Sequence, residues 1–263
     1  MQDLTISLIQ THVAWEDPDA NLSHFEEKIK LIEGGTNLII LPEMFNTGFT
    51  MDARKNAEDM NGITMEWMAD MAKYMDAVVC GSLIIHEEGG YYNRLVWMRP
   101  DASFDTYDKK HLFRMGDEHK HYSQGSERLI TVIKGWKVLP LICYDLRFPV
   151  WSKNRYEEGE YAFDLMVYVT NWPSARSLAF TSLLRARAIE NMAYVAGSNR
   201  IGSDGRKYDF EGKSIITGPD GGIILDLGKD ADKTDSITLK PGPLQEIRSK
   251  LGVGMDWDKF ELI

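Results

Sequence analysis

Cys143 stands where an apolar run gives way to polar residues. In the stretch VLPLICYDLRF, residues 138–142 have the length and content of a buried strand, and Tyr144, Asp145 and Arg147 follow. The ends of strands are where α/β proteins carry their chemistry. Free cysteine is also among the most buried residue types, so a core role is the alternative. Cys143 is therefore a candidate nucleophile at the end of a strand.

Three other charged residues occupy ambiguous positions. Glu43 directly follows the apolar run 38–42, where partial desolvation makes a carboxylate a better base at neutral pH. Lys109 lies in TYDKKHLF, and Glu118 lies in RMGDEHKHY. A helix cap or a solvated surface charge would explain each of them singly. Together, Glu43, Lys109 and Cys143 supply the base, the oxyanion-stabilising cation and the nucleophile of a thiol hydrolase.

The motifs that contain these three residues resemble a known family. LPEMFNTGF, YDKKHLF and LICYDLRFP are similar to the motifs of the nitrilase superfamily of carbon–nitrogen hydrolases, which carry a Glu-Lys-Cys triad. The resemblance implies that Glu43, Lys109 and Cys143 form this triad. The family lysine precedes the histidine of the K-x-H-L-F pattern by two residues, so it corresponds to Lys109 and not to Lys110.

The same resemblance extends along essentially the whole chain. It implies that Glu118, seven residues before Gly125, is the second glutamate of the family site. It implies one carbon–nitrogen hydrolase domain over residues 1–263. The expected fold is α/β, a four-layer αββα sandwich in which two mixed sheets pack face to face and helices cover their outer faces.

Two further stretches look like those of the bacterial ω-amidases. These are FRMGDEHKHY and TNWPSARSLAFTSLLRARAIENMAYVAGSNRIGSDG. ω-Amidases hydrolyse the terminal amide of 2-oxoglutaramate and related 2-oxo acid amides, so the resemblance implies this amidase reaction through a cysteine thioester, without a cofactor. Other amidases of the superfamily, acting on N-carbamoyl amines, aliphatic amides or nitriles, are the alternatives. A catalytically silent binding subunit of the same fold is another.

The mechanism requires residues that bind the oxyanion and the substrate. A backbone N–H just after the cysteine, that of Tyr144, would hold the oxyanion together with Lys109. For Arg147 we favour a structural ion pair, and a substrate carboxylate is the alternative partner. The candidate pocket residues are Phe49, Arg147, Asn171, Trp172 and Arg176.

A metal site is the rival interpretation of one segment. His111, His119 and His121, with Asp117 and Glu118, could bind a metal, because His-x-His on a strand directs both rings to one face. No cysteine or third histidine has a matching spacing, so we expect no metal. The other cysteine, Cys80 in VVCGS, is expected to be a buried structural residue.

Composition restricts the partners. The formal net charge is −10, with 40 acidic and 30 basic residues, which disfavours nucleic acid and anionic membrane as partners. No apolar window approaches the roughly 18 residues of a membrane-spanning helix. The opening MQDLTISLIQ has no secretory signal, and the chain has two cysteines, so we expect a cytoplasmic protein with free thiols. A small-molecule amide is the expected partner, together with a second copy of the chain.

Alternating strands and helices are predicted to position these residues. Apolar periodicity predicts strands at 4–10, 37–43, 77–85, 138–142, 164–172 and 193–201, and helices at 18–32, 63–75, 148–159 and 176–191. EEGG and PDGG predict hairpin turns. The resemblance implies at least a homodimer, formed through helices of one outer layer, with 148–159 and 176–191 as the first candidates. The candidate catalytic residues then lie at strand ends.

Overall fold

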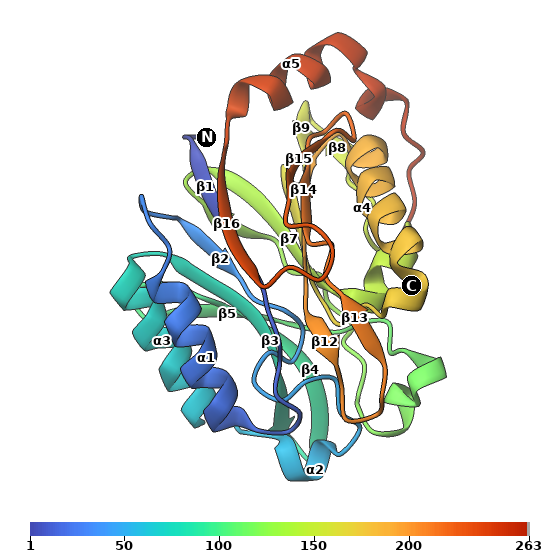
Figure 1. The fold of residues 1–263 in the computed structure, drawn as a ribbon. Coiled ribbons are helices and arrows are strands. Elements are labelled where there is room, and N and C mark those ends of the chain that lie inside the picture. The colour runs from blue at the N-terminus through green and yellow to red at the C-terminus, as the bar shows by residue number, and fades with distance from the viewer. Residues whose placement is uncertain (262–263) are drawn as a thin grey trace.

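Two six-stranded mixed sheets form the centre of the protein, which is described here over residues 1–261 from a computed structural model (Figure 1). The first sheet has the order β16–β1–β2–β3–β4–β5. Its strands are β1 (Leu4–Gln10), β2 (Leu38–Ile40), β3 (Val78–Glu87), β4 (Gly90–Met98), β5 (Phe104–Asp108) and β16 (Lys233–Leu239). β1, β2 and β3 are parallel, and β5 returns to their direction after the antiparallel β4. The carboxyl ends of β2 and β5 therefore meet at one edge.

The second sheet has the order β15–β14–β11–β10–β7–β6. Its strands are β6 (Thr131–Ile133), β7 (Trp136–Ile142), β10 (Leu165–Thr170), β11 (Tyr194–Asn199), β14 (Ile215–Thr217) and β15 (Ile223–Asp226). The three central strands, β7, β10 and β11, are parallel, so their carboxyl ends also share an edge.

The alternation of side chains along β1 explains why two cores form. Ile6 and Leu8 face the second sheet and belong to the large apolar cluster that both sheets share. Ile9 faces the opposite side and packs in a separate cluster with Phe25 and Met68, which lie on helices. Both faces of the first sheet are therefore buried.

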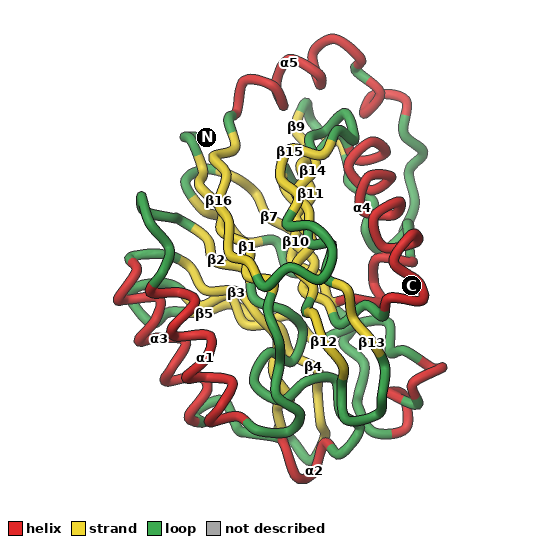
Figure 2. Tube along the Cα trace, in the orientation of Figure 1, coloured by secondary structure: helices red, strands yellow, loops and turns green. Residues whose placement is uncertain are grey.

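Helices cover the two outer faces (Figure 2). α1 (Pro18–Lys30) and α3 (Ile63–Met75) lie on the first sheet, and α4 (Ser177–Asn191) packs on the second, against β11 and β14. α1 begins where Asp17 accepts a hydrogen bond from the Ala20 N–H and Pro18 occupies the first turn. The short α2 (Ala53–Asn56) and the C-terminal α5 (Pro241–Leu251) complete the helices. These layers confirm the predicted αββα sandwich.

The prediction of a helix at 148–159 is wrong. The chain forms a 3-10 helix at Cys143–Arg147, then turns, then the hairpin of β8 (Tyr156–Glu157) and β9 (Glu160–Tyr161). Glu158 and Gly159 both have positive φ, 53° and 85°, which suits a two-residue hairpin turn. The other predicted helices and both predicted hairpins are present, and a further hairpin joins β12 (Ile201–Ser203) to β13 (Asp209–Glu211).

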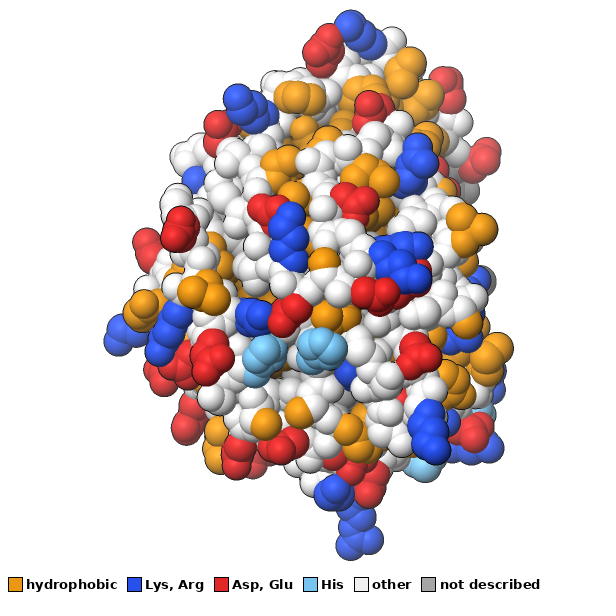
Figure 3. All heavy atoms as spheres, viewed as in Figure 1, with side chains coloured by type: hydrophobic (Ala, Val, Ile, Leu, Met, Phe, Trp, Pro, Cys, Tyr) orange, Lys and Arg blue, Asp and Glu red, His pale blue; other side chains and the backbone are white. Residues whose placement is uncertain are grey.

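The surface carries charges of both signs. On the face shown in Figure 3, Lys and Arg side chains are interspersed with Asp and Glu. Among the residues described, none of the helices combines the length and the apolar character that crossing a membrane demands.

Candidate active site

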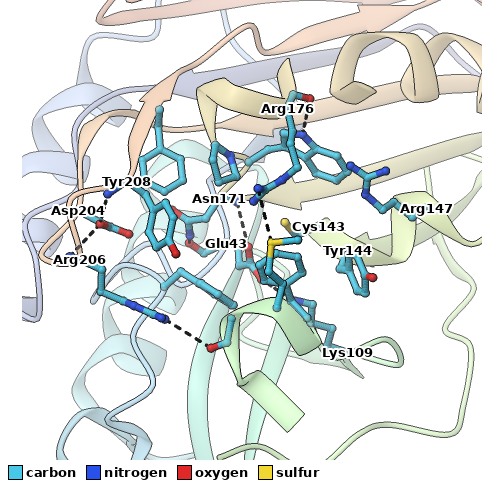
Figure 4. Close-up of a pocket in the computed structure, with 17 residues that line it drawn as sticks. Glu43, Lys109, Cys143, Tyr144, Arg147, Asn171, Arg176, Asp204, Arg206 and Tyr208 are labelled. Carbon is cyan, nitrogen blue, oxygen red and sulfur yellow. Dashed lines mark hydrogen bonds and ion pairs between the residues drawn. The ribbon is translucent and has the colours of Figure 1, made fainter. Parts of the chain in front are cut away.

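Four polar side chains meet where strands of the two sheets end (Figure 4). Glu43 follows β2 by three residues, and Lys109 directly follows β5, so both come from the first sheet. Cys143 directly follows β7, and Asn171 directly follows β10, so both come from the second. The packing of the two sheets is therefore what brings the predicted nucleophile to the predicted base.

Sharp turns present two of the candidate residues. Cys143 has φ of 41°, and Met44, next to Glu43, has φ of 43°. This left-handed region is unfavourable for residues other than glycine and persists where surrounding structure enforces it, commonly at functional sites. The turn at Cys143 joins β7 to the 3-10 helix that Cys143 begins, and Cys143 is 9% exposed and lines the pocket.

Lys109 lies between two glutamates in a buried cluster. Its Nζ is 2.7 Å from Glu43 Oε1 and 3.0 Å from both carboxylate oxygens of Glu118. The two glutamates are 0% exposed and Lys109 is 1% exposed. Two hydrogen bonds within the cluster come from Asn93, whose Nδ2 donates to Glu43 Oε1 at 2.9 Å and to Glu118 Oε1 at 3.2 Å.

Burial and charge shift the pKa values of this cluster. Burial and the nearby Glu43 carboxylate hold the pKa of Cys143 well above its ordinary value, and Lys109 opposes them. Burial also raises the pKa of Glu118, again against the effect of Lys109. Burial would lower the pKa of Lys109, but Glu118 and Glu43 outweigh it and raise the pKa. Lys109 therefore stays a cation, and the Cys143 thiol needs a base.

Glu118 supports Lys109 from behind the pocket. It lies in the 3-10 helix Glu118–Lys120, and its Oε2 accepts the Phe113 N–H at 2.5 Å. It is absent from the pocket lining, whereas Glu43, Lys109 and Cys143 all line the pocket. Glu118 therefore contacts the candidate catalytic residues of the pocket through Lys109.

Asp145 joins the cysteine turn to the lysine loop. Its Oδ2 accepts the Ile142 N–H at 3.1 Å and the Tyr107 hydroxyl at 2.7 Å. Its Oδ1 accepts the His111 N–H at 3.0 Å and lies 2.8 Å from His111 Nδ1. This buried carboxylate fixes the residues on both sides of Lys109 relative to those on both sides of Cys143.

The five predicted pocket residues all line one open pocket of about 630 Å³. These are Phe49, Arg147, Asn171, Trp172 and Arg176, and Tyr144 lines it too. The favoured structural ion pair of Arg147 is wrong: within residues 1–261 no carboxylate pairs with it, and its guanidinium lies 4.9 Å from the Trp172 ring centroid. Because Trp172 forms the pocket wall, stacking on it keeps the Arg147 charge at the pocket.

Sequence interpretation missed the β12–β13 hairpin as a pocket wall. Asp204, Arg206, Tyr208 and Phe210 line the pocket. Arg206 donates from Nη1 to the Gly116 carbonyl at 3.5 Å, across the mouth of the pocket. Asn93 was also missed, and the only signal was a polar residue inside the strand sequence YYNRLVWM.

The histidine-rich segment does not assemble the ligands considered above. His119 lies in a 3-10 helix with His121 just after it, so the strand geometry that would align their rings is not formed. His111 contacts Asp145 and stacks on Phe148 with ring centroids 3.7 Å apart. In the described part of the chain, no three His, Cys, Asp or Glu side chains gather as metal ligands would.

Comparison with known proteins agrees with this geometry. The family model described as carbon-nitrogen hydrolase matches residues 5–249. The chain is 42% identical to the omega-amidase YafV of Escherichia coli K12 over the full length of both, and 31% identical to the 2-oxoglutaramate amidase of Bacillus subtilis, covering 86% and 87% of the two chains. The crystal structure of a CN-hydrolase superfamily protein from Xanthomonas campestris, with an arsenic adduct in its active site, superposes with a TM-score of 0.97 at 41% identity over both complete chains. The chain therefore belongs to the carbon–nitrogen hydrolase family, the nitrilase superfamily that its three motifs predict, and is a hydrolase of carbon–nitrogen bonds.

Proposed function

We propose that this protein is an ω-amidase that hydrolyses the terminal amide of 2-oxoglutaramate, or of a related 2-oxo or dicarboxylic acid monoamide, to the acid and ammonia. The relatives named above support the reaction. The observation that carries the substrate class is a pocket lined by Cys143 and by three arginines, Arg147, Arg176 and Arg206. Within residues 1–261, none of the three pairs with a carboxylate.

In the first half of the proposed reaction, Glu43 takes the thiol proton and the Cys143 sulfur attacks the amide carbon. The carbonyl oxygen becomes an oxyanion. Lys109 and the Tyr144 N–H stabilise it. Tyr144 lies in the first turn of the 3-10 helix Cys143–Arg147, so its N–H has no intrahelical partner. Such a donor contributes about 3–4 kcal/mol to the transition state.

In the second half, Glu43 gives its proton to the amide nitrogen, the C–N bond breaks, and ammonia leaves a thioester on Cys143. Glu43 then takes a proton from water as the water oxygen attacks the thioester carbon. The C–S bond breaks, the sulfur recovers the proton, and the free acid leaves. These steps use only groups of the chain and water, in keeping with the expectation that no cofactor is needed.

Arg176 is the strongest candidate for the group that binds the substrate carboxylate. Its guanidinium lies 5.3 Å from the Phe113 ring centroid and 4.0 Å from Met115 Sδ, and no carboxylate among residues 1–261 pairs with it. Arg147 is stacked on Trp172, and Arg206 already donates to a backbone carbonyl. A buried carboxylate left without a partner is costly, so a cation with free donors favours acids over neutral amides.

Ammonia release from a panel of amides tests the proposal. The panel holds 2-oxoglutaramate, succinamate, glutamine, a short aliphatic amide, a nitrile and an N-carbamoyl amine. The four- and five-carbon acids with a terminal amide should give the highest kcat/KM. A tenfold preference for another member, about 1.4 kcal/mol of transition-state stabilisation, contradicts the ω-amidase assignment in favour of another amidase. Hydrolysis of none of them favours a catalytically silent binding subunit.

We also propose that the protein works in the cytoplasm as a homodimer or larger homo-oligomer, and that residues 1–263 are one domain. Of the two candidate interface segments only α4 is a helix, and it exposes Leu178 by 80% and Ile189 by 53%. Light scattering at micromolar concentration should give at least twice the chain mass of 30.0 kDa, and a single-chain mass contradicts self-association.

A further inference from the structure

In the described structure, Asn93 is the one neutral side chain that donates hydrogen bonds to both glutamates of the buried cluster. It lies in β4 and is 0% exposed. The two hydrogens of its amide go to different residues, one to Glu43 Oε1 at 2.9 Å and one to Glu118 Oε1 at 3.2 Å. Its backbone carbonyl accepts the Lys109 N–H at 3.0 Å. Asn93 therefore contacts Lys109 through its main chain and both carboxylate partners of Lys109 through its side chain.

The charges of the cluster explain why such a group is needed. Glu43 and Glu118 together carry two negative charges when ionised, and Lys109 supplies one positive charge. The other titratable groups facing them are Cys143 and Tyr122, which are neutral in this state; the Tyr122 hydroxyl donates to the Thr50 carbonyl at 2.6 Å. A buried excess of negative charge favours uptake of a proton, and hydrogen-bond donors to the carboxylates oppose that uptake.

We propose that Asn93 is a positioning residue for the amidase reaction, whose side-chain amide holds Glu43 and Glu118 apart and orients Glu43 as the base for Cys143. This rests on the proposed function for the roles of Glu43 and Cys143. A planar amide suits the task, because its two donors diverge at a fixed angle and it adds no charge. The amide cannot be reversed without placing its oxygen against two carboxylates. Asn93 does not line the pocket, so it acts through Glu43 and Lys109.

The test compares Asn93→Ala with Asn154→Ala. Asn154 is the matched control, because it is 1% exposed and its Nδ2 also donates two hydrogen bonds, to the Phe163 and Asn191 carbonyls, away from the cluster. In Asn93→Ala, kcat should fall by about tenfold or more at neutral pH with KM within about twofold. The acidic limb of kcat/KM should move up by about one pH unit, because the pair of buried carboxylates loses a donor to its ionised form. Asn154→Ala should leave the limb in place.

A second readout separates this inference from the proposed function. The rate at which iodoacetamide alkylates Cys143, followed against pH, depends on the same proton equilibrium and needs no substrate. Its acidic limb should move up in Asn93→Ala by the same amount as that of kcat/KM. If no amide of the panel is hydrolysed, the proposed function fails and the alkylation limb alone decides the role of Asn93.

Asn93→Asp keeps the shape of the side chain and replaces its donors with a third carboxylate. Its acidic limbs should move to higher pH than those of Asn93→Ala, since like charges favour proton uptake. Unchanged limbs in the folded variants would overturn the proposal, even if activity falls. Failure of both variants to fold would also overturn it, because Asn93 would then be a requirement of the fold.

Discussion

Asn171 holds the Glu43 carboxylate from across the interface between the two sheets. Its backbone N–H donates to Glu43 Oε2 at 2.9 Å, and its side-chain amide donates to the Glu43 carbonyl at 2.5 Å. Glu43 belongs to the first sheet, and Asn171 follows β10 in the second, the sheet that also carries Cys143. The candidate base is thus oriented by the sheet that presents the candidate nucleophile, so the site depends on how the sheets pack.

Lys109→Met should remove turnover, with a loss in kcat of about 10³-fold or more, because the oxyanion loses a buried cation. The variant should also unfold more easily, by about 3–5 kcal/mol, since Glu43 and Glu118 lose their counter-ion. Steady-state kinetics and urea unfolding measure the two effects. The neighbour Lys110→Ala is the control and should be mild, because Lys110 lies over the Trp151 ring outside the cluster. If Lys110→Ala is inactive and Lys109→Met is active, the catalytic lysine is Lys110 and the motif has been placed one residue too early.

Asp145→Asn should weaken the turn that presents Cys143. Each carboxylate oxygen accepts a backbone N–H, Oδ1 from His111 and Oδ2 from Ile142, so the amide nitrogen of Asn would face a donor at either position. We expect a loss of about 1–3 kcal/mol of stability and a lower kcat, measured by thermal unfolding and by turnover. Asp70→Asn, at an exposed position of α3, is the control. Normal kcat in folded Asp145→Asn would show that the turn is held without it.

Arg176→Met should raise KM for carboxylated amides by about 10- to 100-fold, the loss expected for a hydrogen-bonded charge. KM for a neutral amide should change little, so the preference for acids should fall. Kinetics with succinamate and a short aliphatic amide make the comparison. Arg185→Met is the matched control, because Arg185 lies on α4 and donates to the Gly221 carbonyl outside the pocket. Equal losses for both amides would assign Arg176 another role.

Glu211→Gln should destabilise the protein at neutral pH but not in acid. Lys213, Ser177 and Lys229 lower the pKa of Glu211 from 4.5 to about 2. The native state thus binds this proton less readily than the unfolded chain, so the stabilisation is complete above about pH 4.5 and disappears as the pH falls towards 2. Urea midpoints of the wild type and Glu211→Gln should converge over that range. A difference that is constant with pH would show that packing, not charge, is responsible.

The positions of Glu43 and Cys143 could be predicted because apolar runs mark the strands that they follow. Parallel strands place their carboxyl ends together, so residues distant in sequence were expected at one edge. The helix expected at 148–159 failed because its apolar residues pack on the Tyr107 and His111 segment, and because Glu158–Gly159 forms a tight turn. The local periodicity of apolar residues predicts neither this tertiary packing nor this turn.

The pocket wall and Asn93 were harder to predict for another reason. The segment GSDGRKYDFEG is polar and lacks periodicity, yet it folds as the β12–β13 hairpin over the pocket. In the alternation of side chains along β4, Asn93 looks like a polar residue on an exposed face. Only its partners from other elements, Glu43 and Glu118, distinguish it from a surface position. Partners that tertiary packing supplies leave no pattern in the neighbouring residues.

Mass spectrometry of the enzyme during turnover tests the central claim most directly. The protein is mixed with excess succinamate, quenched in acid within the steady state, and digested to locate any acyl group. The account predicts an acyl adduct on the peptide containing Cys143, and its absence in Cys143→Ala, which should stay folded and inactive. Cys80, fully buried between the sheets, should remain unmodified, and Cys80→Ala should keep near-normal rates. Turnover by the Cys143→Ala variant, or an acyl adduct on Cys80, would contradict the account.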